Sequence, residues 1–311
     1  MSQGIAIVFP GQGSQSIRML EHYFSNEKKF NYVFDISKEV LGLDFKDLIL
    51  NGSSEDLSST EITQPLMLTA NNAIWECLEI EVKDVKIMAG HSLGEFSAFV
   101  ASKALTFEEA LILVSLRAKF MQQAVPEGKG AIAAIIGLNY QELNSICLSI
   151  SKEDEVVELA NINSINQIVI SGTKDAVDKA ISQCSEAGAK RSVLLPMSVP
   201  AHCKLMKPAS ERFKKALDNV NMQLPKSNVI QNVDASISND IDKIRENLIS
   251  QIYCPVRWAD IMESFNQINL QKHIECGPGK VLSGLMKRAL KDTEIISLDN
   301  YESFSNKEYV S

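Results

Sequence analysis

Short, mainly apolar runs that lead into glycine-rich turns mark the first part of the chain. Residues 5–9 (IAIVF) and 85–89 (VKIMA) are such runs. Apolar runs of this length are typical of strands buried on both faces of a parallel sheet. Helical patterns follow them, over residues 16–41, 64–80, 93–101 and 106–123. Strands that alternate with helices indicate an α/β layer.

The order of elements changes over residues 131–195. Strand patterns are expected at residues 131–137, 155–162, 167–173 and 190–196, and helical patterns at 140–150 and 174–188. This β-α-β-β-α-β order is that of a ferredoxin-like unit. Strand–helix alternation then resumes with KHIEC (272–276) and EIISL (294–298), so the unit is predicted to be an insertion.

The predicted fold is therefore α/β with two subdomains. Residues 1–127 and 198–311 form a discontinuous, α/β-hydrolase-like large subdomain with a parallel sheet. Residues 128–197 form the ferredoxin-like (βαββαβ) small subdomain. The polar residues 300–311 are expected to be a loose tail.

Composition and charge exclude several classes of protein. The chain of 311 residues carries a net charge of −8, which argues against a nucleic-acid binder because such proteins usually have a basic face. No run approaches the roughly 18 apolar residues of a membrane span. The six cysteines are scattered, without a CxxC pair, which indicates reduced thiols. We expect a cytoplasmic monomer without a metal site.

Residues 90–94 (GHSLG) match the G-x-S-x-G pattern between an apolar run and a helical stretch. In that context the serine stands on a strained turn with its hydroxyl exposed, next to a helix N-terminus. Ser92 is therefore a candidate nucleophile. The alternative is that Ser92 merely caps an ordinary helix.

A serine nucleophile needs a base, and the chain has four histidines. His91 adjoins Ser92, so its side chain should diverge from the hydroxyl. His22 and His273 fall on an expected helix and strand, where packing explains them. His202 lies in a loop just after a strand, where functional residues concentrate, and by elimination it is the candidate base.

Acyl transfer also needs an oxyanion hole, usually made of two backbone N–H groups. The Leu93 N–H follows the nucleophile, and the Gln12 N–H, in the loop after the first strand, is the candidate for the second. A dinucleotide-binding fingerprint is the alternative for this loop, but its third glycine is replaced by Ser16.

Arg117 is expected on the buried side of its helix. The residues three and four positions away are Leu113, Val114, Phe120 and Met121, all apolar. An unpaired buried guanidinium costs several kcal/mol. Arg117 therefore either pairs with a core carboxylate or binds an anionic group of the substrate through a bidentate contact.

Five blocks in order, FPGQGSQ, TQP, GHSLGE, VPAH and ECGPGKVL, together resemble the malonyl-CoA:acyl carrier protein transacylases of type II fatty-acid synthesis. The resemblance implies transfer of malonyl from malonyl-CoA to the phosphopantetheine thiol of acyl carrier protein, with no permanently bound cofactor. It implies that Ser92 carries the acyl group, that His202 is base and then acid, that Gln12 and Leu93 bind the oxyanion, and that Arg117 binds the malonyl carboxylate. By the same likeness the Gln251 backbone carbonyl orients His202, and Gln64, His91 and Asn163 line the acyl site.

Two positions depart from the family pattern, Ile132 and Ile165. Both are expected in the small subdomain lining the cleft, where they would alter pocket shape. The alternative functions are a serine esterase or thioesterase with the same turn, and a non-catalytic dinucleotide-binding module.

Overall fold

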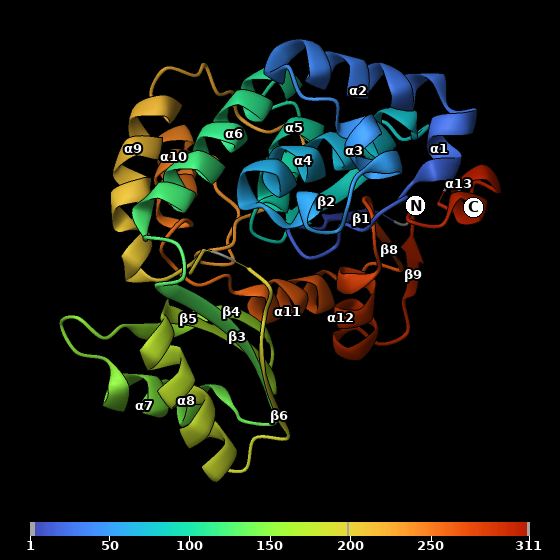
Figure 1. Ribbon diagram of the computed structural model, residues 1–311. Helices are drawn as coiled ribbons and strands as arrows, with labels where there is room; N and C mark the ends of the chain where they lie inside the picture. Colours follow the sequence, from blue (N-terminus) through green and yellow to red (C-terminus); the bar gives the residue numbers. More distant parts are fainter. Residues whose placement is uncertain (1–3, 198, 310–311) are drawn as a thin grey trace.

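The computed structural model describes residues 4–197 and 199–309 and has two separate sheets, each with its own helices (Figure 1). Within these residues, five parallel strands form the larger sheet in the order β7-β2-β1-β8-β9. Their bounds are Asn228–Ile230, Val85–Gly90, Ile5–Phe9, Lys272–Glu275 and Glu294–Ser297. The α/β class and the parallel sheet are confirmed.

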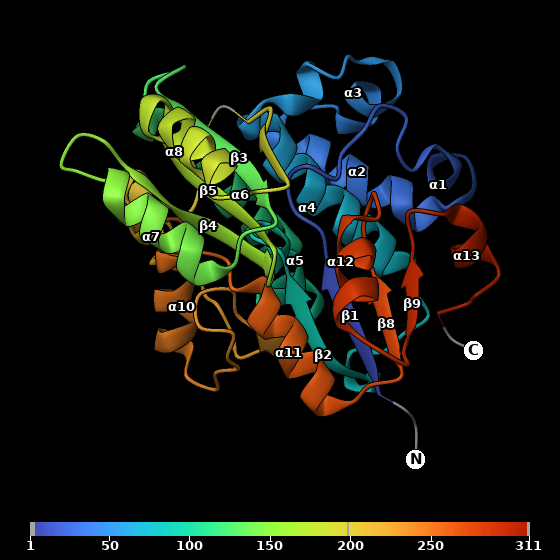
Figure 2. The same cartoon turned by 90° about the horizontal axis from the view of Figure 1, so that it is seen from below.

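Both faces of this sheet are covered by helices. Alternate residues of β1 point to opposite faces, with Ile7 and Phe9 in one hydrophobic cluster and Ala6 and Val8 in another. One face packs on α1 Glu21–Asn26, α2 Lys28–Leu41, α3 Phe45–Asn51, α4 Thr60–Cys77, α5 Gly94–Ala101, α6 Phe107–Ala124, α9 Lys207–Leu217 and α10 Ile241–Ser250. The other packs on α11 Trp258–Ile268 and α12 Val281–Ala289, in front of the sheet in Figure 2.

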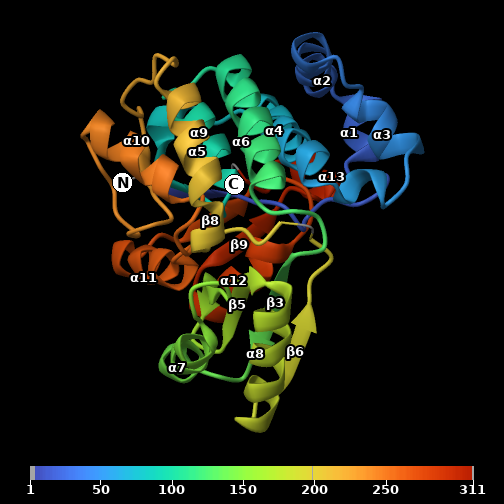
Figure 3. The ribbon, with the colours of Figure 1, turned by 60° about the vertical axis from the view of Figure 1, so that its left-hand side comes forward.

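The smaller sheet is antiparallel in the order β4-β5-β3-β6. Its strands are β3 Gly130–Ile136, β4 Val157–Ser164, β5 Gln167–Thr173 and β6 Arg191–Leu194, with helices α7 Tyr140–Ile150 and α8 Lys174–Glu186. The β-α-β-β-α-β order matches the sequence prediction. Both helices cover the outer face of this sheet, away from the larger sheet (Figure 3).

Three details of the prediction were wrong. In place of the expected helix over residues 16–41 there are two helices, of which the first starts at Glu21. It starts there because Arg18 and Leu20 adopt left-handed backbone conformations, and the two helices are separate because Glu27 is extended. The helix expected at 64–80 starts at Thr60 and contains Pro65. The tail is not loose over residues 300–309, since α13 Tyr301–Ser305 forms there and Tyr309 is buried. Residues 310 and 311 lie outside the described residues.

The subdomains meet along the strand β4. Ile162 donates its backbone N–H to the Val256 carbonyl at 2.8 Å, and the Val256 N–H donates to the Ala160 carbonyl at 2.9 Å. The inner face of the small sheet presents Ile132, Ala134 and Val169 to the pocket described below. The predicted boundaries at 127/128 and 197/198 stay a prediction.

Candidate active site

Ser92 stands on a sharp turn between β2 and α5, with a left-handed φ of 52°. The turn requires glycine on either side because the backbone approaches itself closely. A Cβ on Gly90 would lie 1.9 Å from the Gly94 carbonyl carbon, and a Cβ on Gly94 would lie 2.1 Å from the Phe9 carbonyl oxygen. The strand–turn–helix context that G-x-S-x-G requires is thus present.

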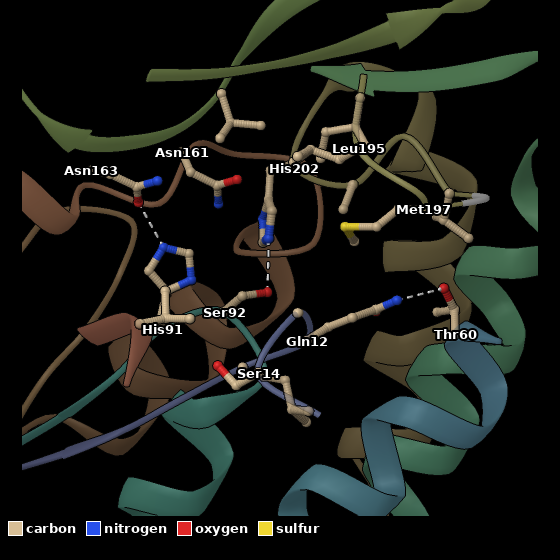
Figure 4. A pocket seen from close by; sticks show the side chains of 18 of the residues that line it. Gln12, Ser14, Thr60, His91, Ser92, Asn161, Asn163, Leu195, Met197 and His202 are labelled. Carbon is tan, nitrogen blue, oxygen red and sulfur yellow. Dashed lines mark hydrogen bonds between the residues drawn. The ribbon is translucent and has the colours of Figure 1, made fainter. Parts of the chain in front are cut away.

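The structure brings His202 to Ser92. The Nε2 atom of His202 lies 2.8 Å from the Ser92 Oγ (Figure 4). Its Nδ1 lies 2.7 Å from the Gln251 backbone oxygen. A carbonyl oxygen only accepts hydrogen bonds, so Nδ1 carries the proton and Nε2 is free to accept the serine proton. Burial, helped by the Arg117 charge, lowers the pKa of His202 to about 3. The imidazole is therefore neutral at neutral pH.

Arg117 is 1% exposed and reaches the same hydroxyl. Its Nη2 donates to the Ser92 Oγ at 3.3 Å and to the Gln251 Oε1 at 3.0 Å, and its Nη1 donates to the Gln64 Oε1 at 2.5 Å. Its Nε has no acceptor among residues 4–197 and 199–309. Burial lowers the pKa of Arg117 to about 10, which leaves it charged at neutral pH.

The ion pair considered for Arg117 is not formed. Within the described part of the chain, no carboxylate lies within salt-bridge distance of its guanidinium. Its direct contacts are neutral amides and a hydroxyl, and the Glu95 carboxylate acts on its charge only from beyond salt-bridge distance. A buried cation in this position has unused capacity for an anion. The site can therefore bind a carboxylate next to the candidate nucleophile.

The loop after β1 packs against the Ser92 turn. A Cβ on Gly11 would lie 2.4 Å from the His91 carbonyl oxygen and 3.8 Å from the Leu93 nitrogen, which places the loop beside that nitrogen. Among the hydrogen bonds of the described residues, none uses the backbone N–H of Gln12 or Leu93 as its donor. The Gln12 side chain points away, to the Thr60 Oγ1 at 3.3 Å (Figure 4).

The predicted site residues line one pocket of about 270 Å³ between the subdomains, except Gln251, which lies behind it. The His91 ring turns away from the Ser92 Oγ, as expected, and its Nε2 lies 2.9 Å from the Asn163 Oδ1 (Figure 4). Ile132 lines the pocket. The expectation for Ile165 was wrong, because it lies at the β4–β5 turn with 78% of its surface exposed and outside this pocket.

Comparison with known proteins identifies the family. The model of the acyl transferase domain matches residues 6–300. The chain belongs to this family of acyl transferases. A malonyl CoA-acyl carrier protein transacylase of Haemophilus influenzae is 43% identical over 302 residues, 96% of each chain. The protein of that name from Bacillus subtilis is 40% identical over 96% of this chain and 94% of its own.

Solved structures of related transferases have the same fold. A malonyl CoA-acyl carrier protein transacylase from Coxiella burnetii has a TM-score of 0.94 and 41% identity, over 98% of this chain and 97% of that one. A malonyl-transacylase solved with a type II polyketide acyl carrier protein has a TM-score of 0.93 and 38% identity, over 97% and 98%. The two-subdomain fold of this acyltransferase is thus confirmed.

Sequence reasoning missed Asn232, which holds the nucleophile turn of the acyltransferase. Its Oδ1 accepts the Ser92 backbone N–H at 2.7 Å, and its Nδ2 donates to the Gly90 oxygen at 2.7 Å. The charged and polar residues around it, 226–247, are typical of a solvated loop and helix face. A signal was present, since Asn232 follows the short apolar run of β7, and polar residues at the carboxyl ends of parallel strands meet at one edge.

Between residues 4 and 309, residue 198 excepted, no group of three or more histidine, cysteine, aspartate or glutamate side chains is placed to hold a metal ion. In the same part of the acyltransferase, every helix is too short or too polar to cross a membrane.

Proposed function

We propose that this acyltransferase moves a malonyl group from malonyl-CoA to the phosphopantetheine thiol of an acyl carrier protein, through an ester on Ser92. The observation that carries the proposal is the position of Arg117, a buried cation without a carboxylate partner in the described residues and 3.3 Å from the Ser92 Oγ. The names of the relatives at 36–43% identity agree with it.

In the first half-reaction the Ser92 Oγ attacks the thioester carbonyl while His202 Nε2 takes the hydroxyl proton. The backbone N–H groups of Gln12 and Leu93 donate to the oxyanion of the tetrahedral intermediate. Collapse of the intermediate breaks the C–S bond, and His202 returns the proton to the departing coenzyme A sulfur. The Gln251 carbonyl keeps the histidine in the required tautomer throughout.

The second half-reaction runs the same steps in reverse with a new thiol. His202 takes the proton of the phosphopantetheine thiol, the sulfur attacks the ester carbonyl, and Ser92 leaves with the proton from His202. Arg117 holds the malonyl carboxylate in both halves. A carbonyl oxygen at His202 Nδ1, in place of a carboxylate, distinguishes this site from the usual Ser-His-Asp hydrolase arrangement.

Intact-protein mass spectrometry after brief incubation with malonyl-CoA tests the proposal. We expect a malonyl-sized adduct on the wild-type chain, none on Ser92→Ala, and loss of the adduct when acyl carrier protein is added. Free coenzyme A without an adduct would favour a thioesterase. No adduct and no turnover, with a nicotinamide dinucleotide raising the melting temperature, would favour the dinucleotide-binding module.

The cytoplasmic location, the monomeric state and the lack of a permanent cofactor stay predictions from the sequence. The proposed reaction needs no cofactor, because the serine, the histidine, the two backbone amides and Arg117 provide every proton transfer and charge contact in it.

A further inference from the structure

Glu95 is a fully buried carboxylate that the proposed reaction does not use. It lies in the first turn of α5, three residues after Ser92, and is 0% exposed. No cation among residues 4–197 and 199–309 forms a salt bridge with it. A buried carboxylate without a cation is costly unless hydrogen bonds compensate it, so the groups that donate to it indicate what it does.

Three donors surround this carboxylate. Its Oε2 accepts the Asn232 backbone N–H at 3.0 Å and the Gln251 Nε2 at 2.9 Å, and its Oε1 accepts the Gln231 Nε2 at 3.2 Å. Two of the three donor residues also contact the reacting groups. Asn232 holds the Ser92 turn, and Gln251 contacts both Ser92 and Arg117.

The Gln251 amide lies between a group that needs a hydrogen-bond donor and a group that needs an acceptor. Its Nε2 donates to the Glu95 Oε2 and to the Ser92 backbone oxygen at 2.9 Å, while its Oε1 accepts from the Arg117 Nη2 at 3.0 Å. Above its pKa of about 7, which burial raises from the ordinary value, Glu95 is ionised, and an ionised carboxylate only accepts hydrogen bonds. It therefore keeps the NH₂ group of the amide on its own side, and the amide oxygen must face the guanidinium.

The flipped amide would be unfavourable for Arg117. Its NH₂ group would then oppose the Nη2 of the guanidinium, donor against donor, and Arg117 would keep only Gln64 and the Ser92 hydroxyl as acceptors. A guanidinium free to turn would not present a fixed pair of N–H groups to a carboxylate. Such a fixed pair is what bidentate binding needs.

We propose that Glu95 is a positioning residue, whose carboxylate orients the Gln251 amide and through it fixes Arg117 for the carboxylate of the acyl group. The inference rests on the proposed function and adds a specificity determinant to it. Glu95 does not line the pocket and has no hydrogen bond with the Ser92 hydroxyl, so its removal should affect carboxylated acyl groups more than uncharged ones.

The test compares kcat/KM for malonyl-CoA and acetyl-CoA in Glu95→Gln, Gln251→Met and the double variant. Gln251→Met removes the amide but retains the backbone carbonyl that holds His202. Glu95→Gln should lower malonyl transfer by about tenfold relative to acetyl transfer, the size expected for a hydrogen bond to a charged group. The malonyl-to-acetyl ratio of the double variant should be no lower than that of Gln251→Met, because both substitutions remove the same route from Glu95 to Arg117.

Glu275→Gln is the matched control. Glu275 is also 0% exposed and accepts two hydrogen bonds, from the backbone N–H groups of Leu282 and Ser283 at 3.0 and 2.7 Å. Burial raises the pKa of both carboxyls to about 7. This variant should lose thermal stability with an unchanged malonyl-to-acetyl ratio. If Glu95→Gln does not fold, Glu95→Asp, which retains the charge but shortens the reach to Gln251, should show the same preferential loss.

Equal losses for both acyl groups, or fully additive losses in the double variant, would overturn the inference and leave Glu95 a structural residue. The wild-type malonyl adduct is measured first. Its absence overturns the proposed function together with this inference, whereas its presence with an unchanged ratio in Glu95→Gln overturns this inference alone.

Discussion

Burial leaves the two basic side chains beside Ser92 in opposite charge states. Taking a charge out of water lowers the pKa of both, to about 10 for Arg117 and to about 3 for His202. Because the ordinary values are 12.5 and 6.5, the arginine stays charged at neutral pH and the histidine becomes neutral. One environment thus provides both an anion-binding group and a proton acceptor.

Arg117→Ala should weaken malonyl transfer selectively. Removing the partner of a desolvated carboxylate costs roughly 2–5 kcal/mol, which corresponds to about a thirtyfold loss or more in kcat/KM. Acetyl-CoA, which lacks the carboxylate, should be used as well or better. Lys119→Ala, on the exposed side of the same helix, is the control and should change neither rate. Equal losses for both substrates would contradict the role of Arg117.

His202 should make the fold less stable in acid. Between pH 6.5 and 3 the unfolded chain binds a proton at His202 that the folded chain does not, so this contribution to stability falls as the pH falls. From pH 7 to 5 the free energy of unfolding of the wild type should drop by about 2 kcal/mol more than that of His202→Gln. Urea unfolding at both pH values measures this, and identical drops would mean that folded His202 is protonated.

At the scale of elements, the site depends on how closely β1, β2 and the start of α5 approach one another. The Ser92 turn passes so near the end of β1 that the His91 N–H donates to the Phe9 carbonyl at 3.0 Å. Only glycine permits this approach on both sides of the serine. The geometry of the nucleophile is thus a property of the strand–turn–helix unit together with its neighbouring strand.

Gly90→Ala should displace this unit. Its Cβ would overlap the Gly94 carbonyl, so the turn must move, at a cost of several kcal/mol in stability, and malonyl adduct formation should fall below detection. Gly188→Ala is the control, since Gly188 has a φ of +92° but no atom within 4 Å of the added Cβ. It should cost about 1 kcal/mol with normal adduct formation. Thermal unfolding and intact mass give both readouts.

At the scale of the whole molecule, the small sheet holds the loop that carries the candidate base. The buried Ser171 of β5 donates its hydroxyl to the Ala201 carbonyl at 2.7 Å, and the His202 N–H donates to the Ile252 carbonyl at 3.1 Å in the large subdomain. His202 therefore depends on both subdomains. A shift of one subdomain against the other should therefore displace His202 more than Ser92, whose turn lies within the large subdomain.

Ser171→Ala should slow the transfer of every acyl group equally. It leaves the Ala201 carbonyl buried without its partner, which costs about 1–3 kcal/mol and loosens His202, a residue needed for any acyl group. Parallel losses for malonyl-CoA and acetyl-CoA would differ from the selective loss expected of Arg117→Ala. Ser145→Ala, which removes only an exposed hydroxyl bound within its own helix, should leave both rates unchanged.

The sequence by itself determined the parts of this protein that depend on neighbouring residues. The G-x-S-x-G turn and the order of elements in the small sheet are set by local patterns. So is the start of α6, where the Thr106 and Glu109 side chains each accept a hydrogen bond from the other residue's backbone N–H, in a capping box. The ordered motifs also carried a resemblance to the family that the comparisons confirm. His202 emerged only by elimination, and the function of Arg117 stayed open until the family was considered.

Only the tertiary structure decided what surrounds these residues. Glu95, Asn232 and Gln251 are joined by hydrogen bonds between positions 137 and 156 residues apart, and no local period predicts such contacts. The same limit explains the two errors at Ile165 and Tyr309. Whether an apolar side chain is covered depends on which distant element packs over it, which the order of residues nearby does not contain.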